Sequence, residues 1–364
     1  RREMSLRTTT KTINGDSLTP ILIFRRLQGK QKFLLESHSK HEDSGRYSFI
    51  GMDPIKAFIG NGDQLQEFTY ANGKIYTHEG DIFTILKSLM PRISEHQAFP
   101  FAGGAVGYVG YGAGKKQSDG PVNKLGIPEI YLNIYETVIV FDHVENIVTV
   151  LRTEVDIVKK HETLDGLIEK ILYGKEEKEE NFTLGTFESD VSQREFEKLV
   201  EKGQQFIQAG EVEQIVLSRR LEAEFEGDPF LLYRDLRRKN PSPYMYYMEM
   251  GESVIVGASP ESLVKVTDGK MMTNPIAGTR KRKKDAHENE RIAEELKTDP
   301  KELAEHDMLV ELGKQDVQKI CIPESVKVTK YQDLVHYEHV MHLVSEVEGE
   351  LAVGVHPLDA LTTC

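Results

Sequence analysis

Polar and apolar positions in the first half of the chain follow the pattern of short strands joined by tight turns. Asn-Gly pairs between apolar stretches are strong hairpin signals, and two segments show the spacing of an amphipathic helix. The predicted elements are hairpins with turns at 61–62, 72–73 and 142–146, and helices at 82–90 and 164–172. This half is therefore predicted to be α+β with antiparallel pairing.

The second half begins with a clearer helix signal. Ser192 and Glu195 form a capping box, apolar residues follow at helical spacing to Ile207, and Gly210 is placed to end the helix. Apolar runs separated by Gly and Pro turns then predict strands. The predicted strands are 212–221, 244–250, 253–256, 263–266 and 271–273, and the predicted helices that follow are 288–296 and 300–312.

A highly charged run without periodicity, residues 175–181, separates the two halves. We predict an N-terminal α+β domain over 1–174, a linker over 175–190 and a second domain over 191–364. The fold class expected is α+β, with two interleaved lobes of mainly antiparallel β-sheets flanked by helices.

Length and charge limit the possible functions. The 364 residues correspond to two domains at about 150 residues each. The net charge of −13 disfavours binding to nucleic acid and to anionic membranes. Two cysteines are too few for a disulfide framework or a thiolate zinc site. With no apolar run near the roughly 20 residues that span a bilayer, we expect a cytoplasmic protein.

Two apparent motifs fail on spacing. The glycine-rich segment 103–116 has Val109 where a Walker loop needs glycine and Lys116 where it needs Ser or Thr. His336, His339 and His342 recur every three residues but lack a neighbouring carboxylate or cysteine at metal-site spacing. One of these histidines is better suited to acid–base chemistry or hydrogen bonding.

The segment 299–313 reads as a helix with Asp299 as N-cap, Pro300 at the first position and Gly313 at the end. On this helix Glu302 and Glu305 continue an apolar stripe. A carboxylate that faces inward needs a partner, and three outcomes stay open: Mg²⁺ binding, ion pairs with Arg or Lys, or exposure to solvent. Glu302 also suits a capping role.

Several stretches together resemble the chorismate-utilising enzymes, most closely the large (component I) subunits of anthranilate synthases. They run in family order across nearly the whole chain. The matching stretches are Leu34-Leu35-Glu36-Ser37, Asn240-Pro241-Ser242-Pro243-Tyr244-Met245, Gly257-Ala258-Ser259-Pro260-Glu261, Pro275-Ile276-Ala277-Gly278-Thr279-Arg280, Glu302-x-x-Glu305-His306 and Val340-Met341-His342-Leu343.

The resemblance implies that chorismate and ammonia give an aminated intermediate, which loses pyruvate to leave anthranilate. It implies Mg²⁺ as cofactor and a separate glutamine amidotransferase subunit as the source of ammonia. The residues that carry over are Glu261 and His342 as catalytic groups, Gln214, Ala258, Gly278 and Thr279 as substrate-binding residues, and Glu302 and Glu305 as metal ligands.

Two positions discriminate within the family. Gln214 stands where water-using relatives carry a lysine that serves as a base. Ala277 stands where aminodeoxychorismate synthases commonly carry a nucleophilic lysine, and alanine forms no covalent adduct. Both favour anthranilate as product. The alternatives are an aminodeoxychorismate synthase component I and a non-catalytic, tryptophan-binding regulatory subunit.

The resemblance also implies feedback inhibition by tryptophan. Two trios would form its site between the lobes: Leu35, Glu36 and Ser37, and Pro243, Tyr244 and Met245.

Some stretches depart from the family pattern. Residues 313–317 lack the usual Arg-Asn-Asp run, and 279–283 lack the customary proline and glycine. A later Gly-Thr-x-Ser-Gly-Ala-Pro-Lys stretch, further Mg²⁺ ligands and a substrate-binding arginine are also expected but absent from the sequence given. We therefore expect the catalytic lobe to be incomplete at its C-terminal end and this chain alone to be inactive.

Overall fold

The computed structural model describes residues 7–37, 45–91, 98–114, 125–155 and 161–364. The chain divides into two compact units, one made of residues 1–177 with 233–364 and the other of residues 178–232. The first break lies inside the predicted linker. The second break, after Leu232, lies inside the segment predicted as the second domain, so the predicted domain boundaries stay a prediction.

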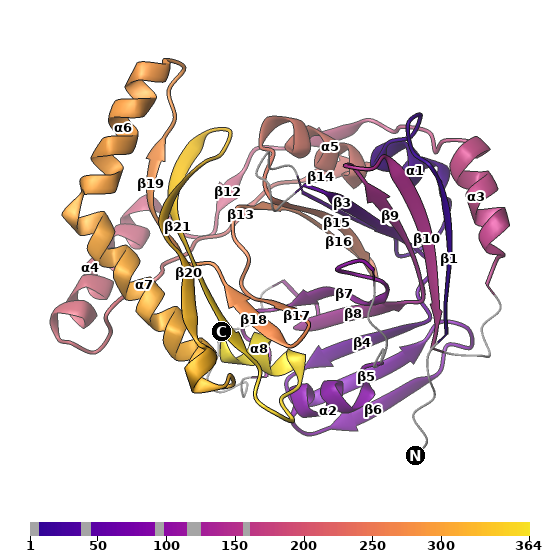
Figure 1. The fold of residues 1–364 in the computed structure, drawn as a ribbon, viewed down its shortest axis with the longest axis horizontal. Coiled ribbons are helices and arrows are strands. Elements are labelled where there is room, and N and C mark those ends of the chain that lie inside the picture. Colours follow the sequence, from indigo (N-terminus) through magenta and orange to yellow (C-terminus); the bar gives the residue numbers. More distant parts are fainter. Residues whose placement is uncertain (1–6, 38–44, 92–97, 115–124, 156–160) are drawn as a thin grey trace. The chain divides into compact units, whose positions relative to one another are not determined.

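The larger unit contains a seven-stranded antiparallel sheet with strands in the order β1-β10-β9-β3-β2-β15-β16. Its strands are β1 (Arg7–Asn14), β2 (Phe33–Glu36), β3 (Tyr47–Gly51), β9 (Thr137–Asp142), β10 (Ile147–Glu154), β15 (Tyr244–Met250) and β16 (Ser253–Ser259). Because β15 pairs with β2, strands from both sides of the linker share one sheet (Figure 1).

A second sheet of the same unit has five antiparallel strands in the order β6-β5-β4-β8-β7. They are β4 (Lys56–Asn61), β5 (Gln64–Thr69), β6 (Ile75–Glu79), β7 (Gly104–Val109) and β8 (Ile130–Tyr135). The predicted turns at Gly62 and Gly73 are confirmed, and both glycines have positive φ. Helix α2 (Ile82–Leu89) packs on this sheet through Ile82 and Leu86.

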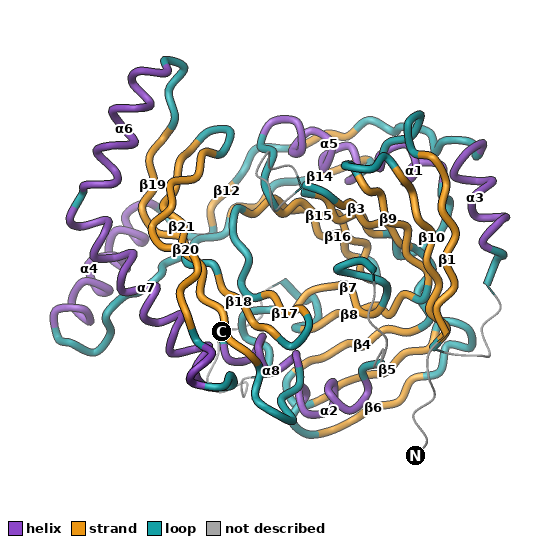
Figure 2. The backbone as a smooth tube through the Cα atoms, in the orientation of Figure 1, coloured by secondary structure: helices purple, strands orange, loops and turns teal. Residues whose placement is uncertain are grey.

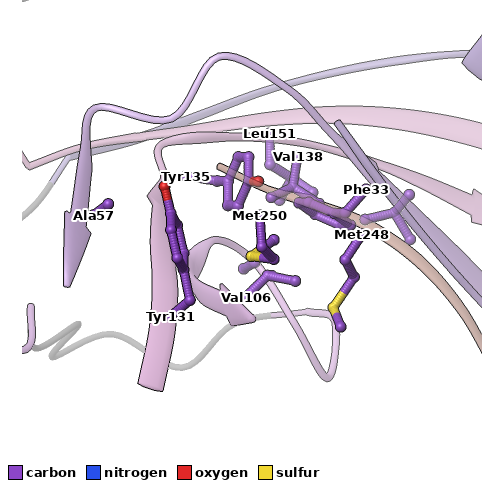
Figure 3. Close-up of a cluster of buried hydrophobic side chains, with 11 residues drawn as sticks. Phe33, Ala57, Val106, Tyr131, Tyr135, Val138, Leu151, Met248 and Met250 are labelled. Carbon is purple, nitrogen blue, oxygen red and sulfur yellow. The ribbon is translucent and has the colours of Figure 1, made fainter. Parts of the chain in front are cut away.

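One apolar cluster joins the seven-stranded and five-stranded sheets. Phe33 of β2 contacts the ring of Tyr135 from β8 with 4.6 Å between centroids, and Met248 and Met250 of β15 enter the same cluster (Figure 3). Helices α1 (Pro20–Arg26) and α3 (Leu164–Tyr173) also belong to this unit. Residues that are far apart in the sequence, near 33, 135 and 250, therefore pack into one hydrophobic core.

The third sheet of the larger unit has the order β17-β18-β21-β19, with β20 also paired to β21. Its strands are β17 (Lys265–Thr267), β18 (Lys270–Thr273), β19 (Ile276–Lys281), β20 (Lys327–His336) and β21 (Val340–Glu350). Helices α6 (Ala286–Thr298) and α7 (Pro300–Gln318) lie along it (Figure 2). The 3₁₀ turn η1 (Pro323–Ser325) and helix α8 (Pro357–Thr363) follow.

Helix α7 begins as predicted but does not end as predicted. Asp299 accepts hydrogen bonds from the backbone N–H groups of Lys301 and Glu302, and Pro300 is the first helical residue. Gly313 was expected to end the helix and instead lies within it. A Cβ at this position would lie 3.4 Å from Pro275 Cγ, so the glycine allows helix and sheet to approach closely.

The smaller unit has little regular structure besides helix α4 (Gln193–Gln208), whose predicted capping box is confirmed. Two short pairs, β11 (Phe182–Leu184) with β14 (Phe225–Gly227) and β12 (Glu188–Ser189) with β13 (Leu221–Glu222), complete it. The strand predicted over 212–221 is wrong except for its last residue, because no described strand pairs with 212–220. Helix α5 (Pro229–Lys239) runs from this unit into the larger one.

None of the helices in the described part of the chain is both long and apolar enough to cross a membrane.

Candidate active site

The candidate site lies on β19 and β21, where the strand register shifts. Ile276 pairs with Val344 and Thr279 pairs with His342, so β19 holds one more residue than β21 over this stretch. Ala277 and Gly278 therefore both oppose Leu343, which is the arrangement of a β-bulge. Gly278 has a φ of +91°, a conformation that favours glycine.

Thr279 and His342 are brought together by this register. The Thr279 hydroxyl lies 2.8 Å from His342 Nδ1. Burial lowers the pKa of His342 from its ordinary 6.5, and a hydrogen bond with the backbone of Gly278 opposes that shift. The imidazole is thus held in its neutral form at lower pH than a free histidine, which suits a group that accepts a proton.

Glu261 follows β16 on a turn in which Ser259 Oγ accepts a hydrogen bond from the Glu261 N–H at 3.2 Å. Burial raises the pKa of the Glu261 carboxyl, although a hydrogen bond from the Ile276 backbone lowers it in part. Glu261 therefore reaches the start of β19. A carboxyl with a raised pKa keeps its proton to higher pH and suits a general acid.

Tyr337 belongs to the same neighbourhood, and sequence reasoning missed it. Its ring packs edge-on against His342 with 5.2 Å between centroids. Burial raises the pKa of Tyr337, and the charges of Tyr244 and Glu261 raise it further. Its place just before Val340-Met341-His342 could have drawn attention to it, but an isolated tyrosine at a strand end carries no spacing signal.

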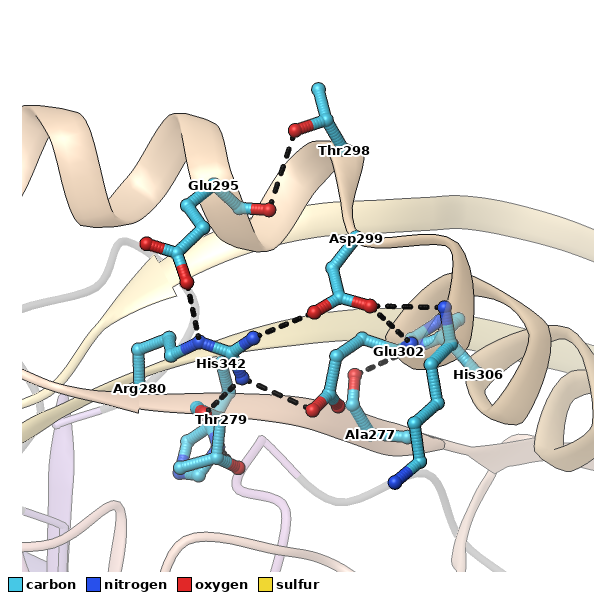
Figure 4. Close-up of polar contacts among 10 residues, drawn as sticks. Ala277, Thr279, Arg280, Glu295, Thr298, Asp299, Glu302, His306 and His342 are labelled. Atoms are coloured by element: carbon cyan, nitrogen blue, oxygen red, sulfur yellow. Dashed lines mark hydrogen bonds and ion pairs between the residues drawn. The ribbon is translucent and has the colours of Figure 1, made fainter.

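The two carboxylates predicted as metal ligands lie on the first turns of α7 and have different surroundings. Arg280 donates from Nη1 to Glu302 Oε1 at 3.0 Å and from Nη2 to Asp299 Oδ2 at 2.9 Å (Figure 4). Glu302 therefore forms an ion pair with Arg280, and its role as a metal ligand stays a prediction. Glu305 lies on an exposed part of the helix.

The buried face of α7 is not the stripe that the sequence predicted. The packed residues are His306, Val310 and Val317, and Leu312 is 40% exposed. The sheet therefore meets the helix through the His306 side, and the carboxylates flank this contact. The expected inward orientation of Glu305 is wrong.

A cavity of about 460 Å³ opens beside Glu261. Its lining includes Asp316 and Thr273. The Thr273 hydroxyl is buried and finds no partner among the described residues. The full lining is Ser259, Glu261, Ser262, Leu263, Thr273, Asn274, Pro275, Leu309, Leu312, Gly313, Asp316 and Cys364.

The two trios predicted as a tryptophan site lie on neighbouring strands. Glu36 of β2 is opposite Met245 of β15, and Met245 is in turn opposite Ala258 of β16. Pro243 precedes β15, and Tyr244 is the first residue of the strand and is 44% exposed. The structure thus places Ala258 one strand from the second trio and two strands from the first.

Glu36 has the strongest polar contacts of these residues. Its side chain is 1% exposed and receives hydrogen bonds from Arg237 Nε at 2.9 Å and from the Tyr233 hydroxyl at 2.5 Å. Ser37 Oγ is buried and finds no partner in the described part of the chain. Leu35 is half-buried beside the apolar cluster of the two larger sheets.

Gln214 belongs to the smaller unit, where its side chain is exposed. The predicted substrate-binding role of Gln214 therefore stays a prediction.

The chain resembles one enzyme family over most of its length. A family model described as chorismate binding enzyme matches residues 30–364. Anthranilate synthase component 1 of Lactococcus lactis is 37% identical, over 96% of this chain and 78% of its own length. The same component from Thermus thermophilus is 36% identical, over 97% of this chain and 77% of its own.

Solved structures agree with the sequence matches. Anthranilate synthase component I from Streptococcus pneumoniae superposes with a TM-score of 0.74 at 32% identity, covering 96% of this chain and 78% of that chain. The menaquinone-specific isochorismate synthase MenF from Escherichia coli has a TM-score of 0.68 at 16% identity, covering 99% of this chain and 74% of its own. The second likeness shows a common fold.

Proposed function

The chain belongs to the chorismate binding enzyme family, and we propose that it converts chorismate and ammonia into anthranilate and pyruvate as the large component of an anthranilate synthase. The observation that carries the proposal is the pairing of Thr279 with His342 at the bulge, with Glu261 reaching the same strand. Relatives that share 33–37% identity over nearly the whole chain support this reaction.

The two catalytic candidates have complementary proton affinities. Burial raises the pKa of Glu261 and lowers the pKa of His342. A protonated Glu261 would donate to the C4 hydroxyl as it leaves as water, while ammonia forms the new bond at C2. A neutral His342 would then accept the C2 proton as pyruvate is eliminated and the ring becomes aromatic.

Substrate contacts are proposed for backbone and small side chains around the bulge. Gly278 is proposed to contact substrate through its backbone, and the Thr279 hydroxyl is exposed next to His342. Ala258 of β16 is proposed to contact substrate as well. Gln214 is proposed to contact substrate without acting as a base, because an amide cannot take up a proton.

Mg²⁺ is the cofactor that we propose, held by Glu302 and Glu305. Among the described residues no group of three His, Cys, Asp or Glu side chains could hold a metal ion. Mg²⁺ is commonly bound by only one or two carboxylates together with substrate oxygens and water, so this pair fits. When bound, the ion would neutralise a substrate carboxylate. The Arg280 contact orients Glu302 towards the sheet.

The regulation and the partner are also part of the proposal. Tryptophan would inhibit by binding between the trio 35–37 and the trio 243–245, which lie on adjacent strands. A glutamine amidotransferase subunit would supply the ammonia in the cytoplasm.

The product decides between the candidate functions. The protein is incubated with chorismate, ammonium and Mg²⁺, with and without the amidotransferase subunit and glutamine, and anthranilate is followed by fluorescence and chromatography. Anthranilate supports the proposal. A different aminated product would mean that Ala277 and Gln214 misled us, and tryptophan binding without any turnover by the complete protein would favour a regulatory subunit.

The metal assignment has its own test in the Mg²⁺ dependence of the rate. Glu305→Gln is expected to raise the Mg²⁺ concentration for half-maximal rate by about tenfold or more, since metal-site substitutions typically cost 10–100-fold in affinity. Glu311→Gln is the matched control, because Glu311 lies on the same helix and pairs with Lys314 at 3.6 Å. Equal Mg²⁺ requirements in the two variants would contradict the assignment.

A further inference from the structure

The extra residue in β19 decides which face of the sheet its neighbours occupy. On β21 the odd-numbered residues from Met341 to Gly349 are buried and the even-numbered ones are half-buried. Thr279 pairs with His342 on the half-buried face, and Arg280 pairs with Met341 on the buried face. Arg280 can therefore reach Glu302 and Asp299 of α7.

Without the extra residue these two side chains would exchange faces. If the register continued from the Ile276–Val344 pair without a shift, Gly278 would oppose His342 and Thr279 would oppose Met341. A one-residue slip moves each side chain of a strand to the opposite face. Thr279 would then turn towards the helices, and Arg280 would turn towards His342.

A bulge leaves a backbone group outside the regular ladder, and a buried side chain satisfies it here. His306 of α7 is 0% exposed, and its Nδ1 lies 2.9 Å from the carbonyl oxygen of Ala277. Since a carbonyl only accepts, Nδ1 must carry the proton. His306 thus bonds directly to the first residue of the bulge (Figure 4).

The other ring nitrogen of His306 is also fixed. Ser345 Oγ accepts a hydrogen bond from the Gln332 N–H at 2.9 Å and lies 2.5 Å from His306 Nε2. The Ser345 hydroxyl proton is therefore directed to Nε2, which accepts it. The tautomer of His306 with its proton on Nδ1 satisfies both ring contacts. Together with the bond from Gln332 to Ser345, these hydrogen bonds link α7, β19 and β20 to β21 at the bulge.

We infer that His306 is a positioning residue for the reaction: its bond to the Ala277 carbonyl fixes the bulge that sets Thr279 against His342 and Arg280 against Glu302. His306 has no access to substrate, because it is fully buried. The inference rests on the proposed function, since it assigns His342 and Glu302 their roles.

Two substitutions, His306→Asn and His306→Gln, test the two hydrogen bonds of His306 one at a time. An Asn side chain reaches the position of Nδ1 and can still donate to the Ala277 carbonyl, whereas a Gln side chain reaches the position of Nε2. Val310→Ala is the control for a general loss of helix packing, because Val310 lies one turn further along α7 and is 5% exposed. Thermal unfolding of all three variants establishes the loss of stability in each.

The first measurement needs no activity: the ring ¹⁵N chemical shifts of His342 in the labelled protein. We expect wild-type shifts in His306→Asn and Val310→Ala and changed shifts in His306→Gln. The second measurement is kcat and KM for chorismate in the complete enzyme. There His306→Gln should lower kcat by about tenfold or more, the effect of one buried acceptor left without its donor, and His306→Asn should restore most of it.

Equal shifts in the Asn and Gln variants, or a loss of kcat in Val310→Ala that matches the loss in His306→Gln at similar stability, would overturn the inference. If the shifts change as expected but the complete wild-type enzyme makes no anthranilate, the positioning role stands and the proposed function fails.

Discussion

Gly278→Ala is the substitution with the best-defined cost at this site. Gly278 has a φ of +91°, which costs an L-residue about 1–2 kcal/mol. An added Cβ would also lie 3.1 Å from Leu343 Cδ1 and 3.2 Å from Leu296 Cδ1. Both leucines are fully buried, so they have little room to move, and overpacking of this kind costs about 1–3 kcal/mol.

The expected loss in free energy of unfolding is therefore about 2–5 kcal/mol, the sum of the backbone and packing costs. The matched control is Gly269→Ala, since Gly269 has a φ of +73° with nothing within 4 Å of an added Cβ. It bears only the backbone cost of about 1–2 kcal/mol. Urea unfolding followed by circular dichroism gives both values from the midpoint and slope.

The difference between the two variants isolates the packing around the bulge. A Gly278→Ala protein should also lose activity beyond its loss of stability, because Thr279 follows the substituted residue directly. If the two variants lost the same free energy and Gly278→Ala kept its kcat, the bulge would be neither tightly packed nor important for placing Thr279.

Two further perturbations test other parts of the site. Arg237→Met should lower the free energy of unfolding by about 3 kcal/mol, because it leaves the buried Glu36 carboxylate without its cation, and a urea titration that shows no loss would contradict this. The kcat should fall as the pH drops through the pKa of His342, which burial holds below 6.5, since the neutral imidazole is the active form. Tyr337→Ala exposes the His342 imidazole to water, which should raise the pKa of His342 and move the acidic limb of the kcat–pH profile to higher pH.

Local signals predicted much of the architecture because their physical causes are local. The Ser192 capping box, the Asp299-Pro300 helix start and the turns at Gly62 and Gly73 depend on a few adjacent residues, and all are confirmed. The antiparallel α+β class follows from the same hairpins.

The errors arose where distant contacts decide the structure. Gly313 looks like a helix end but lies inside α7, because it faces Pro275 of another segment at close range. The run 212–220 has the composition of a strand but has no described partner strand. Helical periodicity placed Glu305 on an inward stripe, whereas contact with the sheet selected the face that carries His306.

The candidate site shows the same limit. The resemblance identified the motifs that contain Thr279, Arg280 and His342. Adjacent side chains of a strand point to opposite faces, and the sequence alone does not show which of Thr279 and Arg280 faces the substrate. A single extra residue reverses the assignment. Its only sign in the sequence is Gly278, and a glycine in a strand also fits a close approach or a bend.

The bulge also explains why the two halves of the proposed site depend on each other. Thr279 contacts His342 on one face, and Arg280 contacts Glu302 on the other. Because both contacts follow from one register, a change that shifts the register would break them together. The Thr279–His342 contact and the Arg280–Glu302 contact are therefore coupled through the backbone of β19.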